Sequence, residues 1–292
     1  MVRPLPPSDV YPAGHLEISQ RFIPLATGVT VRVAEAGPAD GVPVVMLPGW
    51  ASPLYMYRHG FERLPKYGIR AIAVDLRGYG LSDKPEQRGA YSLDAYVADV
   101  DALLDALDLR RVVIVGQSMG GGLALHYALR RSERLRGVVL INPTGLVGLP
   151  FVYLLRGTPR NALALVGKRL VPRAVIGFVL RRLAYGNAAL VTERDVDEYW
   201  APTQLPGYVF AARSALSEFD WKRLTDAEAA SLAVPGVVIL GDADRLVRND
   251  VRAARRLAGA TVHVLEGGHC VHEEQPDEAY GLIGEFVRAT AR

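Results

Sequence analysis

Residues 112–122 read VVIVGQSMGGG, and this stretch decides the fold class. Four consecutive β-branched residues predict a buried strand, and the glycine-rich residues after it open a predicted helix. Ser118 stands between them, two residues after Gly116 and two residues before Gly120. A serine in so sharp a turn needs glycine at both positions, because the neighbouring backbone comes too close for side chains. The pattern therefore predicts a hydroxyl raised above the carboxyl end of a buried strand.

The same turn points the first N–H groups of the helix, including that of Met119, toward the place where an oxyanion would form. The positive end of the helix dipole adds to their effect. An alcohol is a weak nucleophile, however, and needs a basic side chain that is oriented by an acidic one. We therefore expect a histidine and a carboxylate at the ends of later strands.

Both groups are present. Residues 237–247 read VVILGDADRLV, a strand pattern followed by Asp242 and Asp244, and residues 261–269 read TVHVLEGGH, a strand pattern followed by a glycine turn and His269. Loops at the carboxyl ends of parallel strands are where open α/β sheets form their sites. The chain order serine, aspartate, histidine is the one expected of this architecture. The spacing alone leaves Asp242 and Asp244 as alternatives for the acid.

Short β-branched runs alternate with helical patterns along most of the chain, and this alternation predicts a mainly parallel sheet flanked by helices. Several runs are apolar at every position, which is typical of strands covered on both faces. The predicted strands are residues 29–33, 42–47, 70–74, 112–115, 138–141, 237–240 and 261–265, and the predicted covering helices are residues 91–107, 120–130, 250–257 and 276–288.

Between residues 141 and 234 the alternation stops, and helical and loop signals replace it. A stretch of this length is more naturally an insertion than a continuation of the sheet. We therefore divide the chain into an N-terminal arm (1–14), which its prolines indicate to be extended, an α/β core (15–143 and 231–292) and a helical cap or lid (144–230).

The sequence resembles the α/β-hydrolase-fold serine hydrolases with a helical cap. Residues 75–82, DLRGYGLS, resemble the turn after the family's fourth strand, and Gly268-His269 followed by Glu274 and Pro276 resembles its histidine loop. The resemblance covers about residues 29–288 and implies the α/β-hydrolase fold, with a mostly parallel eight-stranded sheet. In this family the acid usually stands three residues after the glycine that ends its strand, which selects Asp244 and leaves Asp242 in reserve.

The resemblance also implies the second oxyanion donor. In such enzymes it comes from the loop after the third strand, usually with a His-Gly pair, and here residues 47–50 read LPGW. Proline replaces the histidine, so we expect the donor to be the backbone N–H of Trp50. Together with Ser118, Asp244, His269 and Met119, this residue completes the predicted site.

The predicted activity is hydrolysis of carboxylic esters of small to medium apolar substrates through an acyl-enzyme. A serine nucleophile argues against the dehalogenase and epoxide hydrolase branches of the family, whose nucleophile is an aspartate. Carbon–carbon bond hydrolases, whose elbow this sequence also resembles, and perhydrolases remain alternatives, as does a ligand receptor on the same fold. An apolar acyl pocket is suggested by residues 146–155 and the cap aromatics Tyr153, Phe178, Tyr185, Trp200 and Tyr208.

Composition excludes several other classes. The chain has 292 residues, of which 22% are charged and 50% hydrophobic, so disorder is excluded, and a net charge of +3 does not predict nucleic-acid binding. The single cysteine, Cys270, cannot form an internal disulfide, and residues 1–7 lack the apolar core of a signal peptide, so we expect a cytoplasmic protein. No nucleotide-binding motif is complete, and His269 with His272 lacks further ligands, so neither a cofactor nor a metal is expected.

The predicted cap is basic. From residue 134 to residue 192 there is no Asp or Glu, whereas seven basic residues lie in the insertion: Arg156, Arg160, Lys168, Arg169, Arg173, Arg181 and Arg182. Solvated arginines on amphipathic helices are the simpler interpretation. The alternative is weak contact of the cap with anionic substrates or a lipid surface.

Overall fold

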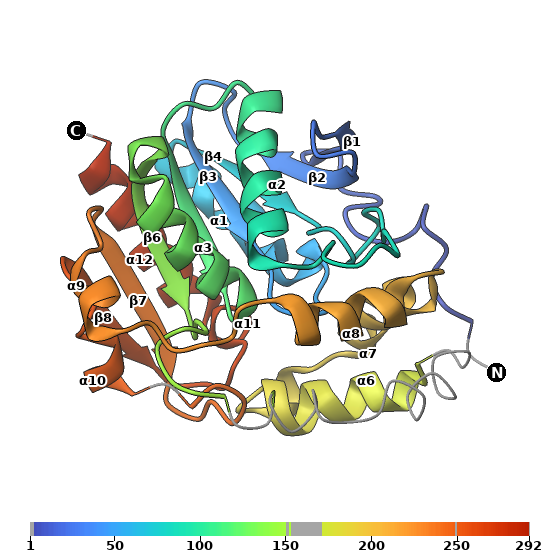
Figure 1. The fold of residues 1–292 in the computed structure, drawn as a ribbon. Coiled ribbons are helices and arrows are strands. Elements are labelled where there is room, and N and C mark those ends of the chain that lie inside the picture. The colour runs from blue at the N-terminus through green and yellow to red at the C-terminus, as the bar shows by residue number, and fades with distance from the viewer. Residues whose placement is uncertain (1–2, 150–151, 153–170, 249, 292) are drawn as a thin grey trace.

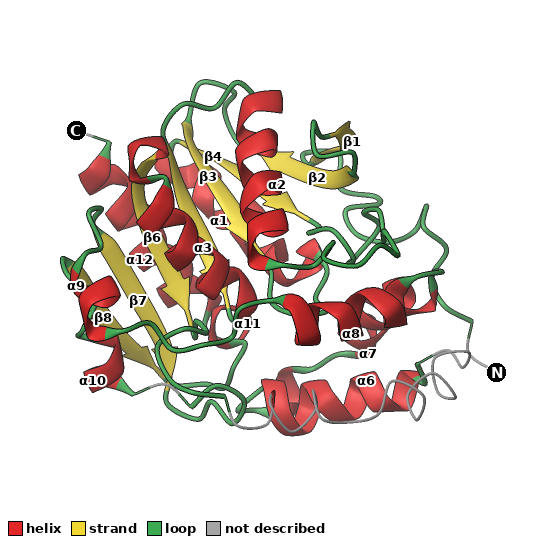
Figure 2. Cartoon of the chain, viewed as in Figure 1, coloured by secondary structure: helices red, strands yellow, loops and turns green. Residues whose placement is uncertain are grey.

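The computed structural model describes residues 3–149, 152, 171–248 and 250–291. One eight-stranded sheet runs through it, in the spatial order β1-β2-β4-β3-β5-β6-β7-β8 (Figures 1 and 2). The strands are β1 (Ser19–Pro24), β2 (Thr30–Ala36), β3 (Val42–Leu47), β4 (Ile69–Val74), β5 (Val112–Gln117), β6 (Leu135–Ile141), β7 (Gly236–Gly241) and β8 (Ala260–Leu265). The predicted mostly parallel α/β-hydrolase fold is confirmed.

From β4 to β8 in this spatial order every neighbouring pair of strands is parallel, whereas β1 with β2 and β2 with β4 are antiparallel. The strands of the parallel part are buried because helices cover both faces. Strand β1 has no counterpart among the predicted strand runs, because its edge position leaves most of its side chains exposed and its sequence, SQRFIP, polar.

Two layers of helices enclose the sheet. Helices α2 and α3 lie against one face, and α1 and α12 lie against the other, as Figure 1 shows. Their bounds, with the short helices at the sheet edges, are α1 (Arg58–Arg63), α2 (Leu93–Ala106), α3 (Met119–Arg130), α9 (Asp226–Ala230), α10 (Val251–Ala254), α11 (Val271–Glu274) and α12 (Pro276–Thr290). Ser92 caps α2 as expected, since its hydroxyl accepts a hydrogen bond from the N–H of Ala95 at 3.2 Å.

The described part of the insertion is helical and crosses the edge of the sheet at which the parallel strands end (Figure 2). It comprises α6 (Arg173–Val179), a π-helical turn (Leu180–Ala184), α7 (Glu193–Trp200) and α8 (Tyr208–Glu218). A capping box starts α7, because Thr192 and Asp195 exchange side-chain-to-backbone hydrogen bonds. The cap therefore lies over the part of the core where a site was predicted.

The N-terminal arm is folded into hydrogen-bonded turns over residues 7–14, where its prolines had indicated an extended segment. It lies between core and cap. The backbone N–H of Tyr11 donates to the carboxylate of Glu198 in α7 at 3.0 Å, and its carbonyl accepts from the guanidinium of Arg32 in β2 at 2.9 Å. The arm thus contributes to the attachment of the cap.

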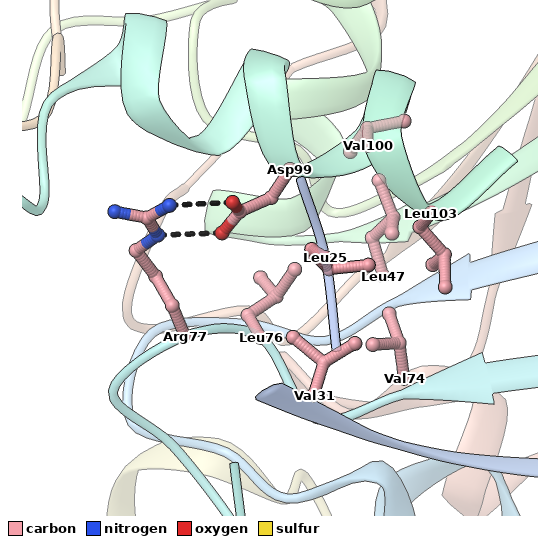
Figure 3. A pocket seen from close by; sticks show the side chains of 9 residues that line it. All are labelled: Leu25, Val31, Leu47, Val74, Leu76, Arg77, Asp99, Val100 and Leu103. Carbon is pink, nitrogen blue, oxygen red and sulfur yellow. Dashed lines mark hydrogen bonds and ion pairs between the residues drawn. The ribbon is translucent and has the colours of Figure 1, made fainter. Parts of the chain in front are cut away.

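A small cavity of about 10 Å³ lies inside the core, between the sheet and α2 (Figure 3). Apolar side chains line most of it, and Arg77 forms two hydrogen bonds with Asp99 at its rim. Its volume is about that of one water molecule, and its lining includes none of the predicted catalytic residues. No helix in the described ranges is long and apolar enough to cross a membrane.

Candidate active site

Ser118 sits in the turn between β5 and α3, in the strained backbone conformation that its surroundings require. Its φ of 53° is unusual for a residue with a side chain. The turn is so tight that a Cβ atom on Gly116 would lie 2.2 Å from the carbonyl oxygen of Gly120, and one on Gly120 would lie 2.1 Å from that of Leu47. Both glycines are therefore required by close backbone contact, as the motif indicated.

Asp244 and His269 come together at the ends of neighbouring strands. The ring Nδ1 of His269 lies 2.8 Å from Oδ2 of Asp244, and their side chains are 8% and 3% exposed. The other carboxylate oxygen of Asp244 accepts the N–H groups of Leu246 at 2.8 Å and Val247 at 3.1 Å. This carboxylate is thus held by the turn after β7 and can orient the imidazole.

The environment of Asp244 favours its charged form. Burial raises the pKa of its carboxyl, but the adjacent His269 and the two backbone N–H donors outweigh burial, so that the pKa lies below its ordinary value. Asp242, the reserve candidate, is exposed and accepts a hydrogen bond from the N–H of Gly267 at 3.0 Å. It stabilises the turn before His269 and does not contact the imidazole.

Ser118 is 9% exposed and lies beside the loop that carries His269. The connection runs through the preceding residue, because the side-chain amide of Gln117 donates to the carbonyl oxygen of His269 at 2.9 Å. Within the described ranges, Oγ of Ser118 makes no hydrogen bond, including with His269. Catalytic hydrogen bonds are often long in unliganded enzymes and shorten when substrate binds. The structure thus brings Asp244 into contact with His269 and places Ser118 next to their loop.

The two predicted oxyanion donors belong to adjacent segments. Met119 is the first residue of α3, where N–H groups have no acceptor within the helix. The loop that contains Trp50 passes close to the elbow, since a Cβ atom on Gly49 would lie 3.2 Å from Cβ of Ser118. The side chain of Trp50 is 37% exposed, and its indole N–H donates to the carbonyl of Ala212 in α8 at 2.8 Å. The cap therefore anchors the loop beside Ser118.

The cap also contacts the His269 loop directly. The carboxylate of Glu274 accepts the N–H of Gly268 at 2.6 Å and, from the cap, the N–H groups of Gly186 and Asn187, each at 2.9 Å. The N–H of Cys270 donates to the carbonyl of Ala184, the last residue of the π-helical turn, at 3.0 Å. π-Helical turns are rare and are frequent at functional sites. Cap and histidine loop thus form one hydrogen-bonded unit.

Three polar side chains that support this site were not singled out from the sequence: Gln117, Asn142 and Glu274. Glu274 appeared only as part of the family pattern, and Gln117 only as a letter of the elbow. Asn142 begins the turn signal NPTG after a predicted strand, which is where a site-supporting residue would stand. Its contacts join segments that are far apart in the chain, and no local pattern reports such contacts.

Other polar residues near the site have different surroundings. Burial raises the pKa of the Cys270 thiol well above its ordinary value, which disfavours the nucleophilic thiolate. Burial also lowers the pKa of His272 to about 3, so its imidazole is neutral. Among the described residues, no group of three or more His, Cys, Asp or Glu side chains could hold a metal ion.

The basic residues of the cap divide into two groups. Arg156, Arg160, Lys168 and Arg169, like the aromatic Tyr153, lie outside the described residues. Arg173 pairs with Glu193 at 2.8 Å and with Asp197 at 2.6 Å, and Arg181 pairs with Glu193 at 2.7 Å. Acidic residues of α7 therefore neutralise these two arginines, although α6 and the π-helical turn contain no acidic residue themselves.

The fold, the elbow and the joined acid and histidine define a class of protein. The chain belongs to the alpha/beta hydrolase fold family, whose family model matches residues 42–276, and it is a hydrolase of that family.

Individual relatives are more distant. The chain is 29% identical over 280 residues to the AB hydrolase superfamily protein YfhM of Bacillus subtilis (strain 168), covering 89% of this chain and 95% of that protein. It is 27% identical over 307 residues to Epoxide hydrolase A of Mycobacterium tuberculosis (strain ATCC 25618 / H37Rv), covering 89% of this chain and 94% of that protein. The solved structure of the epoxide hydrolase CorEH without ligand has a TM-score of 0.82 and 24% identity, over 94% of this chain and 100% of that chain, which shows the shared fold.

Proposed function

We propose that this chain is a serine hydrolase that cleaves carboxylic esters of small to medium apolar substrates through an acyl-enzyme. The observation that carries the proposal is the contact between Nδ1 of His269 and the buried carboxylate of Asp244, at 2.8 Å, on the loop beside the strained Ser118. An imidazole oriented in this way can accept a proton at its other nitrogen.

The proposed reaction has two halves. In the first, Nε2 of His269 takes the proton of Ser118 as Oγ attacks the ester carbonyl, and the N–H groups of Met119 and Trp50 stabilise the oxyanion. Asp244 stabilises the imidazolium, which then gives its proton to the departing alcohol. In the second half, water activated by His269 attacks the acyl group, and the carboxylic acid leaves. No metal or cofactor has a part in this scheme.

Some relatives are named epoxide hydrolase, and the identity of the nucleophile argues against that reaction here. A carboxylate that opens an epoxide or displaces a halide forms an ester, and activated water can hydrolyse an ester. A serine hydroxyl would form an ether, which the same machinery cannot hydrolyse. Ser118 is matched instead to carbonyl substrates, whose acyl-enzyme is an ester. A carbon–carbon bond hydrolase would use the same residues and is the alternative outcome of the substrate test.

The apolar preference rests on the segment after β6 and on the cap. Leu146, Leu149 and Val152 are at most 2% exposed, and they belong to the segment between the sheet and the cap. Tyr185 and Tyr208 of the cap are also buried, whereas Phe178 is 60% exposed and lies away from such an environment. Apolar surroundings of this kind suit an acyl chain better than a charged one.

The proposal is tested by labelling the purified protein with a fluorophosphonate probe and assaying p-nitrophenyl esters of graded acyl length. We expect wild type to be labelled and to release p-nitrophenol, and Ser118→Ala to lose both labelling and at least about 10³-fold of kcat. Cys270→Ala is the matched control, because Cys270 is the other potential nucleophile beside His269, and it should keep both.

Three results would contradict this assignment. Full esterase activity of Ser118→Ala would remove Ser118 as the nucleophile. Labelling of wild type without turnover of any ester, together with cleavage of a vinylogous 1,5-diketone acid, would favour the carbon–carbon reaction. Ligand binding without labelling would favour a receptor.

A further inference from the structure

Asn142 is fully buried at the carboxyl end of β6, the strand that lies between β5 and β7 in the sheet. Strand β5 leads to Ser118, and β7 leads to Asp244. Asn142 is therefore placed between the two strands that carry the nucleophile and the acid, although it belongs to neither of their loops.

The side chain of Asn142 makes three hydrogen bonds to two of the loops that carry the site. Its Nδ2 donates to the carbonyl oxygens of Gly268 at 3.0 Å and His269 at 3.1 Å. Its Oδ1 accepts the N–H of Gly241, three residues before Asp244, at 3.0 Å. One amide group thus fastens the backbone of the base and the start of the acid's turn to the same point.

Only a side chain with a donor and an acceptor on one planar group can make these bonds together. The backbone of Asn142 has a φ of 40°, in the left-handed region that asparagine adopts more readily than other residues with side chains. Asparagine therefore satisfies both the backbone conformation and the bonding pattern at this position.

Gln117 completes the arrangement from the side of the nucleophile. Its amide donates to the same carbonyl oxygen of His269 that Asn142 reaches, at 2.9 Å. Its backbone is directly bonded to Ser118, whose own N–H donates to the carbonyl of Ile141 at 3.0 Å. The carbonyl of His269 is thus held between the residue before Ser118 and the residue after Ile141.

We propose that Asn142 is a positioning residue, whose side-chain amide sets the position of the His269 backbone relative to both Asp244 and Ser118. This inference rests on the proposed function. Asn142 contacts no reacting atom, so its loss should lower the rate of the chemical steps and leave substrate binding largely unchanged. A misplacement of about 1 Å in such a group can lower the rate about 100-fold.

The test uses Asn142→Gly, because glycine tolerates the left-handed backbone and removes only the side chain. The matched control is Ser82→Ala, which removes two buried hydrogen bonds, to Arg32 at 2.8 Å and Asp75 at 2.6 Å, from another loop that comes after a strand. Each purified variant is compared with wild type for the second-order rate of fluorophosphonate labelling, for kcat and KM on a p-nitrophenyl ester, and for the downfield proton resonance of the His269 Nδ1–H.

We expect Asn142→Gly to label and turn over about 10- to 100-fold more slowly, with KM within about twofold of wild type, and to shift or broaden the Nδ1–H resonance. Ser82→Ala should stay within about threefold of wild type in rate and keep the resonance. If Asn142→Gly does not fold, Asn142→Ser is judged by the same criteria.

The proposal is overturned if the folded variant labels within twofold of wild type, if the control loses as much rate, or if KM rises while kcat is kept. It is also overturned if neither variant folds, because Asn142 would then support the fold itself. The resonance separates this failure from failure of the proposed function, since it reports the contact between His269 and Asp244 whether or not an ester is cleaved.

Discussion

The cap is attached to the core on two sides, and the two attachments differ in chemistry. On the α8 side the bonds are neutral: Trp50 donates to the carbonyl of Ala212 at 2.8 Å, and the hydroxyl of Tyr208 donates to the carbonyl of Ala51 at 2.9 Å. On the α7 side the contacts are charged and buried. Arg58 of the core lies between Asp195 of α7, at 3.0 Å, and Glu273 of the histidine loop.

This contrast indicates which attachment the protein can least do without. Neutral hydrogen bonds contribute about 0.5–1.5 kcal/mol each, because water can replace them when the elements separate. Buried charges that lose their partner cannot be compensated in this way. The α7 side should therefore dominate the stability of the cap, while the α8 side holds the loop that carries an oxyanion donor.

The largest expected effect comes from removal of the cation on the α7 side. Arg58 is 14% exposed, and Arg58→Met leaves two carboxylates, at 4% and 0% exposure, without it. Burial lowers the pKa of Arg58, but Glu273, the nearby tyrosines and Asp195 raise it above its ordinary value, so the residue is charged. We expect Arg58→Met to lower the free energy of unfolding by about 3–5 kcal/mol, measured by urea denaturation at pH 7.

Arg63→Met is the matched control on the same helix. Arg63 pairs with Asp277 at 2.7 Å, but that carboxylate is 90% exposed, and such pairs contribute about 0–1 kcal/mol. A difference of less than about 1 kcal/mol between the two variants would contradict the contrast between the two sides of the cap.

The core was predictable from sequence, and the attachment of the cap was not. Strands such as residues 112–115 are apolar on both faces, so a local pattern is enough to identify them, and the elbow after them is defined within five residues. Strand β1 lacks such a pattern because it is an exposed edge. The assignment of the acid needed more than spacing, since Asp242 and Asp244 stand on the same turn and only the folded chain shows which one meets His269.

Polar contacts between segments that are distant in sequence explain the rest. Arg58 and Glu273 are 215 residues apart, and Tyr11 and Glu198 are 187 apart. Each of these residues alone has the pattern of an ordinary surface charge or aromatic. Their burial and partners depend on how the cap settles on the core, which has no local signal.

A smaller effect, dependent on pH, should distinguish the buried charge at Asp195. Burial raises the pKa of its carboxyl, but Arg58, Thr192 and Tyr55 lower it further, so that the pKa is below its ordinary value. A depressed pKa contributes stability that is present above the unfolded value of about 3.9 and is lost as the pH falls through the folded value.

We therefore expect Asp195→Asn to be less stable than wild type by about 1.5–3 kcal/mol at pH 7, with the difference shrinking below about pH 4. Urea denaturation of both proteins from pH 3 to pH 7 measures it. Asp197→Asn on the same helix is the control, because Asp197 is 27% exposed in its pair with Arg173, and its effect should stay below about 1 kcal/mol. Equal effects of the two substitutions, or a difference that grows in acid, would be evidence against the charged attachment.

The smallest effect belongs to the neutral side. Tyr208→Phe removes one hydrogen bond, from the phenol to the carbonyl of Ala51, and keeps the buried ring. Since only one neutral bond is lost, the free energy of unfolding should fall by about 0.5–1.5 kcal/mol. Ala51 has a φ of 60° directly after Trp50, so the released strain should increase amide hydrogen exchange in residues 49–52 while α7 keeps its protection. Faster exchange in α7 than in the loop would mean that the two attachments act as one, and that their chemical difference has no mechanical consequence.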